Sequence, residues 1–418
     1  MPSSRFDGGR IPAFLLLCVL TLGPVSCQRK TTVPRPTIEY VREILAHRSS
    51  DVYKTVAAYD PKSVAGPICL VGEPARCLLI GEVLMACDEV DNVTGSRTPD
   101  GLPDFAGETV LSVLDQANVP YGGFLEASNT AFLRELAVRH VVDCLDTVSF
   151  ISAYDKEGMG RRDPAKLIVF VSPYQAAYGR FDADTLFTCL GIGSPVLSAV
   201  DLLFDRALSR DGGKAVNIGI IADSTVLRSG VYDAVFEEKV REYSAKGSIL
   251  VHGSGNSLTA FLDAYEQAGY TKPLSALLVD DLTVDVDSLQ KALSGIRVEF
   301  SDESLRYGKL VAPDFGIFET SRCVADKLYS HLRSTNTFTH NIAYPKADAL
   351  ICAPRTDLPV SCYGADGGFA PDYKYTRTPV SEIPTTMLLQ YGSRYLPESV
   401  MDILRNQTPK TYRSYVQD

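Results

Sequence analysis

The middle of the chain alternates short apolar runs with longer amphipathic segments. Most of the runs stop at Gly, Pro, Ser or Asp, as buried strands do at turns, and the amphipathic segments have helical length and spacing. Strands are predicted at 67–71, 166–171, 196–199, 216–222, 248–251, 274–279, 298–301 and 349–352. Helices are predicted at 38–58, 75–87, 107–117, 129–145, 230–245, 256–267 and 315–333. This order predicts an α/β protein made of two Rossmann-like lobes, with parallel sheets flanked by helices.

The first thirty residues have the pattern of an export signal. Arg5 and Arg10 precede an apolar run at 11–22, which is shorter than the ~20 residues of a membrane span. Ser26-Cys27 resembles the end of a bacterial lipoprotein signal, although Pro24 stands where leucine is usual. We therefore predict a signal peptide at 1–26, a lipid on Cys27, and a location in the cell envelope, facing the periplasm.

The remaining chain is long enough for two lobes, because one domain takes ~150 residues. After a tether at 27–37, the first lobe is predicted at 38–205, beginning with a helix. The second lobe follows at 206–300, and 301–354 return to the first. Residues 355–418, which are rich in Tyr, Pro, Thr and Arg, are predicted to wrap over the surface as an extension.

Composition narrows the classes of function. A net charge of −10 argues against binding to nucleic acid. No later apolar run approaches the length of a span, so the membrane is predicted to be reached through the lipid anchor only. CxxC, HExxH and GK[ST] motifs are absent, so the motifs predict neither a metal nor a cofactor. Most cysteines lie in apolar runs as small buried residues, and Cys352 with Cys362 is the pair to check for a disulfide.

Four groups of polar residues follow predicted strands, where ligands of open parallel sheets bind. They are 72–74, an acidic loop at 88–108, the stretch 172–185, and the similar loops 223–230 and 252–257. The acidic loop has oxygen ligands for Ca²⁺ or a cationic group, but not the EF-hand spacing. For each group, an ordinary turn with helix caps is the alternative. The predicted ligand contacts are Asp91, Asp104, Ser172, Tyr174, Asp182, Ser224, Ser229, Asn256 and Asp280.

Residues 166–345 resemble type I periplasmic solute-binding proteins. The resemblance rests on VNIGIIADSTVLRSGVYDAVFEEKV at 216–240, LSALLVDDLTVDVDSLQKAL at 274–293 and FGIFETSRCVADKLYSHLRS at 315–334. These segments are similar to that family's second-lobe opening strand and helix, its later strand with acidic residues, and the helix after the returning crossover. The resemblance implies two lobes with a ligand in the cleft between them.

The segment GIIADSTVLRSGVYDAVF also resembles the glycine- and threonine-rich turn of the aspartate/glutamate racemase family. That family moves an α-proton with two cysteines that close strands. Here Ser172 stands at the expected first position, and Ala353-Pro354 follow Cys352 without the usual cysteine-threonine-histidine run. These departures argue against the family's thiol chemistry.

Three functions remain open. The leading prediction is a lipoprotein that binds a small polar solute between its lobes without catalysis. The sequence does not show a transporter partner and leaves one open. The alternative is a racemase- or isomerase-like enzyme that acts on a small carboxylate with an atypical acid/base pair. The third is an envelope interaction protein whose cleft is vestigial.

Overall fold

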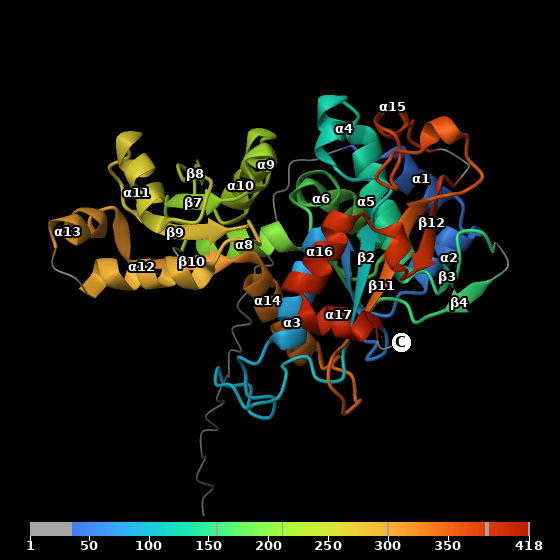
Figure 1. The fold of residues 1–418 in the computed structure, drawn as a ribbon, viewed down its shortest axis with the longest axis horizontal. Coiled ribbons are helices and arrows are strands. Elements are labelled where there is room, and N and C mark those ends of the chain that lie inside the picture. The colour runs from blue at the N-terminus through green and yellow to red at the C-terminus, as the bar shows by residue number, and fades with distance from the viewer. Residues whose placement is uncertain (1–35, 156–157, 211, 299–300, 381–383, 417–418) are drawn as a thin grey trace, which may run out of the picture.

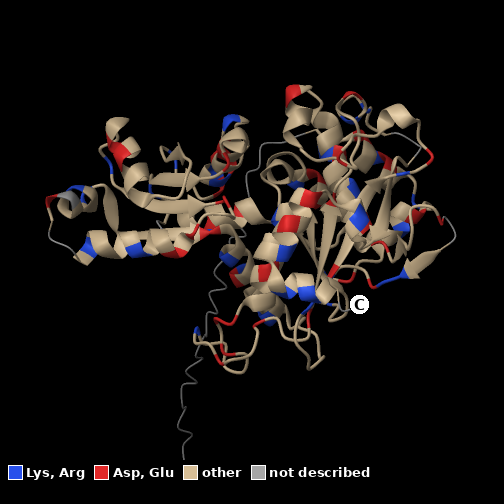
Figure 2. Ribbon diagram, in the orientation of Figure 1, with Lys and Arg blue, Asp and Glu red and all other residues tan. Residues whose placement is uncertain are grey.

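The computed structural model describes residues 36–155, 158–210, 212–298, 301–380 and 384–416. The predicted signal peptide, Cys27 and nearly all of the tether lie outside these ranges. Two lobes are visible, each built on its own sheet (Figure 1). Among the described residues, no helix combines the length and the apolar character needed to cross a membrane. Charged residues of both signs are scattered over both lobes (Figure 2).

The large lobe contains an eight-stranded sheet of order β4-β3-β12-β11-β2-β1-β5-β6. The run β11-β2-β1-β5-β6 is parallel, β12 is antiparallel to β11, and β4 is antiparallel to β3. The bounds are β1 (Ile68–Gly72), β2 (Thr109–Asp115), β3 (Val148–Phe150), β4 (Met159–Arg161), β5 (Leu167–Phe170), β6 (Val196–Ser198), β11 (Lys346–Pro354) and β12 (Thr386–Gln390).

The small lobe contains a four-stranded parallel sheet of order β10-β9-β7-β8. Its strands are β7 (Asn217–Ile221), β8 (Ile249–Gly253), β9 (Leu274–Val279) and β10 (Val311–Glu319). Because β10 belongs to this sheet, the chain returns to the large lobe after Glu319, and not at the predicted residue 301. Gly219 in β7 allows helix α11 to pack closely, since a Cβ there would lie 2.6 Å from the ring of Phe261.

Helices cover both faces of the large sheet. Alternate residues of β1 face opposite cores: Ile68 and Leu70 join one hydrophobic cluster, and Cys69 and Val71 join another. The helices are α1 (Glu39–Ala46), α2 (Asp51–Ala57), α3 (Pro74–Ala86), α4 (Gly122–Glu126), α5 (Thr130–Leu145), α6 (Pro173–Tyr178), α7 (Arg180–Leu190), α8 (Ala199–Leu208), α9 (Ser224–Arg228), α10 (Val231–Glu242), α11 (Leu258–Gln267), α12 (Val286–Val298), α13 (Asp302–Gly308), α14 (Thr320–Thr335), α15 (Pro371–Lys374), α16 (Glu398–Gln407) and α17 (Pro409–Val416), with 3₁₀ turns η1 (Val360–Cys362) and η2 (Ser393–Tyr395).

The α/β class and several elements match the predictions. The Asn129 side chain accepts a hydrogen bond from the amide of Phe132 and so caps α5, and Ser257 caps α11 in the same way. The strands predicted at 166–171, 196–199, 216–222, 248–251, 274–279 and 349–352 appear as β5, β6, β7, β8, β9 and β11.

Three predicted elements are wrong. Residues 107–117 were expected to be helical, but 109–115 form the central strand β2, whose apolar run is buried on both faces. Residues 298–301 were expected to be a strand, but Val298 ends α12 and Ser301 caps α13. The predicted helix 315–333 begins only at Thr320, because its first residues complete β10. Burial on both faces removes the periodicity that separates short strands from helices.

Two further predictions need correction. The helix predicted at 38–58 is two helices, with Ser50 capping the second. The tail 355–418 is part of the large lobe's core and does not only cover its surface. It supplies β12 to the large sheet, and its helices α16 and α17 pack against α3. Leu389 of this tail is fully buried. The antiparallel β12 also makes the large sheet mixed, where a parallel sheet was expected.

Candidate functional site

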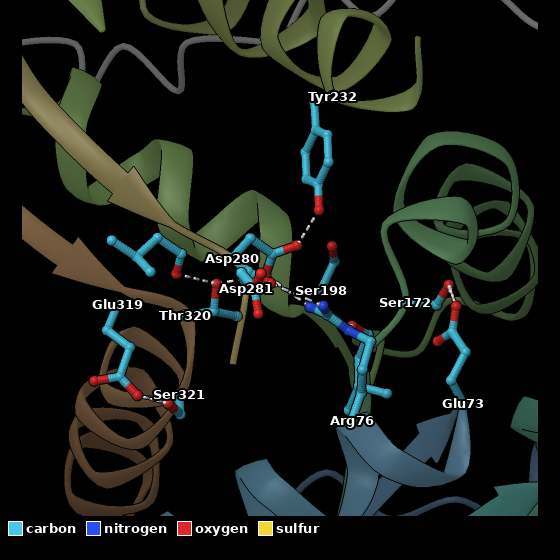
Figure 3. Close-up of polar contacts among 12 residues, drawn as sticks. Glu73, Arg76, Ser172, Ser198, Tyr232, Asp280, Asp281, Glu319, Thr320 and Ser321 are labelled. Atoms are coloured by element: carbon cyan, nitrogen blue, oxygen red, sulfur yellow. Dashed lines mark hydrogen bonds and ion pairs between the residues drawn. The ribbon is translucent and has the colours of Figure 1, made fainter. Parts of the chain in front are cut away.

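The turn after β1 places two charged residues between the lobes. Gly72 has φ of +147°, and a Cβ there would lie 2.8 Å from Val171 and 2.9 Å from the amide oxygen of Gln175. Only glycine fits this close approach. Pro74 then starts α3 at its first turn, so Glu73 and Arg76 lie at the carboxyl edge of the large sheet, facing the small lobe (Figure 3).

The guanidinium of Arg76 joins the two lobes. Its Nε donates to the carbonyl oxygen of Val171 at 2.7 Å, within the large lobe. Its Nη2 donates to Oδ1 of Asp280 at 2.7 Å and its Nη1 to the Asp280 carbonyl oxygen at 3.0 Å, both in the small lobe. Three donors of one planar group are thus fixed by acceptors from both lobes.

Asp280 directly follows β9, and only 1% of the residue is exposed to solvent. Besides Arg76, its carboxylate accepts from the hydroxyl of Thr320 at 2.5 Å and from the phenol of Tyr232. Its backbone amide donates to the carbonyl of Ile221 at 2.8 Å. Burial and the neighbouring Asp280 carboxylate raise the pKa of Tyr232 well above its ordinary value, so this phenol stays protonated and donates.

Glu73 lies on the other side of Arg76, as Figure 3 shows. Its Oε1 accepts from the hydroxyl of Ser172 at 2.8 Å, while its Oε2 is buried and has no hydrogen-bond partner. Burial raises the pKa of Glu73 above its ordinary value, although Arg76 and the Ser172 hydroxyl oppose that rise. The raised pKa brings this carboxyl group closer to neutral pH, the range in which a general acid or base works.

We call Glu73, Arg76, Ser172, Tyr232, Asp280 and Thr320 the interlobe site. Of the predicted contacts, Ser172 and Asp280 belong to it. Tyr174 is buried in α6, and the hydroxyl of Ser229 donates to the carbonyl oxygen of Val226. Ser224 is exposed in α9, and Asn256 is exposed beyond the edge strand β8.

The remaining predicted contacts have structural partners elsewhere. Asp104 accepts from the backbone amides of Glu89 and Val90 at 3.1 Å and closes the acidic loop. Asp91 accepts from two amides of its own turn. Asp182 is fully buried in a two-pronged ion pair with Arg134, with both bonds at 2.8 Å. The structure does not bring these three carboxylates to the interlobe site.

Sequence reasoning missed Arg76, Tyr232 and Thr320, and it treated Glu73 only as part of a turn. A signal for Glu73 existed, because the Gly-Glu-Pro turn at 72–74 was among the polar groups that follow predicted strands, with an ordinary turn as the alternative. The other three lie inside a helix or at its first residue, where charged and polar side chains usually face solvent. Cys352 and Cys362 are both free thiols, so the disulfide considered above does not form.

Comparison with known proteins finds no matching family model and no matching curated protein. Solved structures do match. Glutamate racemase from Francisella tularensis, solved with D-glutamate, is 14% identical over 71% of this chain and 90% of its own, with a TM-score of 0.40.

Two further matches are also racemases. A glutamate racemase isoform from Bacillus anthracis is 15% identical over 68% of this chain and 87% of its own, with a TM-score of 0.38. Glutamate racemase from Campylobacter jejuni is 12% identical over 68% and 92%, with a TM-score of 0.37.

Proposed function

We propose that this chain is an isomerase-like enzyme that moves a proton on the carbon next to the carboxylate of a small acid, in the interlobe site. One observation carries the proposal: two carboxyl groups from different lobes, each bonded to a hydroxyl, lie on opposite sides of one guanidinium (Figure 3). Inversion at a carbon needs an acid and a base on opposite faces, and a guanidinium fork is suited to a carboxylate.

The proton transfer follows from these positions. Glu73, as carboxylate, takes the proton from the α-carbon, and the electron pair of the broken C–H bond delocalises into the substrate carboxylate. Arg76 stabilises the negative charge that develops there. Asp280 takes up a proton from water when the substrate carboxylate replaces it on Arg76, and it then delivers this proton to the opposite face of the α-carbon, where the delocalised electron pair forms the new C–H bond. Glu73 returns the proton it took to water, so the net reaction is an inversion without redox change. Ser172 and Thr320 orient the two acids through their hydrogen bonds.

The ion pair between Arg76 and Asp280 sets how a substrate enters. A substrate carboxylate has to replace Asp280 on the guanidinium, which frees the Asp280 carboxyl group to act as an acid. The two lobes therefore have to separate for binding, because this pair links them. The proposed reacting residues are carboxyl groups, where the racemase family uses thiols. The sequence analysis left the members of such an atypical acid/base pair unnamed.

The test is proton NMR of the protein in D₂O with both enantiomers of small α-amino and α-hydroxy acids, glutamate among them. The expected result is loss of one compound's α-proton signal, slowed at least ~100-fold by Glu73→Gln because the base is removed. Glu237→Gln, on an exposed side chain of α10, is the matched control and should leave the rate unchanged. Absence of exchange with every acid, or equal exchange by Glu73→Gln, would contradict the proposal.

A non-catalytic solute-binding protein is the second candidate. The observation that favours it is that Arg76, Tyr232 and Thr320 all donate to the Asp280 carboxylate, which leaves this residue no proton of its own to give to a substrate. In the same NMR experiment, this function would broaden the lines of one compound without loss of its α-proton. Arg76→Met would then weaken that binding, while Glu73→Gln would leave it nearly unchanged.

Export and lipidation at Cys27 are part of the same proposal. They rest on the order of charged, apolar and small residues in the first 27 positions. Fractionation of bacterial cells that express the full chain tests them. We expect the protein in the membrane fraction and a shift to the soluble fraction for Cys27→Ser, whereas a soluble wild-type protein would refute the anchor.

A further inference from the structure

Three metal-binding side chains meet in the core of the large lobe, away from the hydrogen bonds of the interlobe site. Asp115 ends β2, Cys352 lies near the end of β11, and the two residues are directly paired in the sheet. His140 reaches them from α5, which covers this part of the sheet. One ligand atom from each, a carboxylate oxygen, a ring nitrogen and the thiol sulfur, lie within 4.8 Å of one another.

We propose that Asp115, His140 and Cys352 bind one divalent transition-metal ion, with Zn²⁺ as the best fit to their donor set. Zinc takes thiolate, imidazole and carboxylate ligands, and bond lengths of ~2.0–2.3 Å place the ligand atoms about 3.3–3.8 Å apart in a tetrahedral site. The structure already has the Nε2 of His140 3.1 Å from the Oδ2 of Asp115. Side-chain shifts of under about 1 Å would therefore complete the geometry.

The burial of the cluster supports a ligand there. Asp115, His140 and Cys352 are 0%, 1% and 2% exposed. Nε2 of His140 and Oδ2 of Asp115 lie 3.1 Å apart in this buried cluster, so a metal ion can take the place of their ion pair. The side-chain oxygen of Gln175, next to His140, is buried without a hydrogen-bond partner, which is costly unless His140 donates to it.

The charges of the donor set match a divalent ion. A carboxylate, a thiolate and a neutral imidazole together carry two negative charges, which one Zn²⁺ neutralises, so the buried site has no net charge when the metal is bound.

The side chains around the cluster can hydrogen-bond to the proposed metal ligands and so hold them in place. The Tyr121 hydroxyl donates to Oδ2 of Asp115 at 2.8 Å, and Asn118 donates to Oδ1 at 2.7 Å. The amide of Gln175 lies 3.0 Å from Nδ1 of His140, and its oxygen is buried without a partner. A half-turn of that amide brings the oxygen to Nδ1–H. Metal-bound histidines usually donate their second N–H in this way, which fixes the ring and the tautomer.

In the test, the full chain is refolded from denaturant in the presence of Co²⁺ or Zn²⁺. Refolding is needed because the buried site is closed to metal ions in the folded chain. We expect one metal per chain by elemental analysis and a cobalt–thiolate charge-transfer band in the near ultraviolet. Cys352→Ser should abolish the band. Cys323→Ser, at a buried thiol of α14, is the matched control and should keep it.

Two outcomes would overturn the site. One is a wild-type chain, folded by circular dichroism, that retains less than about a tenth of an equivalent of metal after gel filtration. The other is a thiolate band that survives in Cys352→Ser. If Cys352→Ser fails to fold, His140→Gln provides the second variant, and its retention of the full metal content would refute the assignment equally. Neither result depends on the catalytic proposal, because metal content and absorbance are measured without substrate.

Discussion

The ion pair between Arg76 and Asp280 gives the sharpest test of how the lobes are held together. Its side chains are 18% and 0% exposed, so water screens the pair little. Removing one partner leaves the other charge buried, which costs about 3–5 kcal/mol of the free energy of unfolding. For Asp280→Asn we expect the lower end, about 3 kcal/mol, because Tyr232 and Thr320 retain hydrogen-bond partners.

A double-mutant cycle isolates the pair from the other contacts. Arg76→Met and Asp280→Asn alone should each lower the unfolding free energy by about 3 kcal/mol, which lowers Tm by roughly 6–12 °C for a lobe of this size. The double variant removes both charges and should lose little more than either single one. The coupling energy is then about 2–3 kcal/mol, measured by urea unfolding followed by circular dichroism.

A matched cycle at the surface serves as the control. Arg97 and Asp326 also form an ion pair, at 3.0 Å, but their side chains are 59% and 28% exposed. Arg97→Met with Asp326→Asn should therefore show a coupling several-fold smaller. If the Arg76 and Asp280 substitutions are additive within about 0.5 kcal/mol, the pair does not link the lobes energetically and this reasoning is refuted.

Three other predictions concern stability. The folded-state pKa of Glu73 lies above its unfolded value, so the stability that its protonated form contributes is lost as pH rises through the folded pKa. The Tm of Glu73→Gln should therefore rise relative to that of wild type from about pH 4 upward. A Tm difference that stays constant across pH would contradict this prediction. Gly219→Ala should cost about 1–3 kcal/mol through overpacking against α11, while Gly193→Ala, with open space around it, should cost almost nothing in the same thermal melts. Glu82→Ala removes the carboxylate that accepts hydrogen bonds from the amide and hydroxyl of Thr411 at the start of α17. The rate of amide hydrogen exchange in α17 should therefore rise by about tenfold. An unchanged exchange rate would show that packing alone holds the helix.

The sequence by itself determined the elements whose signals are local. The apolar runs at 166–171 and 216–222 became strands, and Asn129 and Ser257 cap the helices that were expected after them. Strand–helix alternation was enough to predict the α/β class and two lobes, because short connections leave a parallel sheet few other arrangements. Ser172 and Asp280 were predicted as ligand contacts because each directly follows a predicted apolar strand, and both lie in the proposed interlobe site.

Only the tertiary structure decided which residues meet. Arg76 and Asp280 are 204 positions apart, and nothing in either local sequence selects the other. The same is true of Asp115 and Cys352, which become neighbours only because β2 pairs with β11. The strand β2 was itself mistaken for a helix, since burial on both faces erases the alternation that would identify it. Local propensity thus fixes the pieces, while long-range strand pairing and burial fix the two sites that those pieces build.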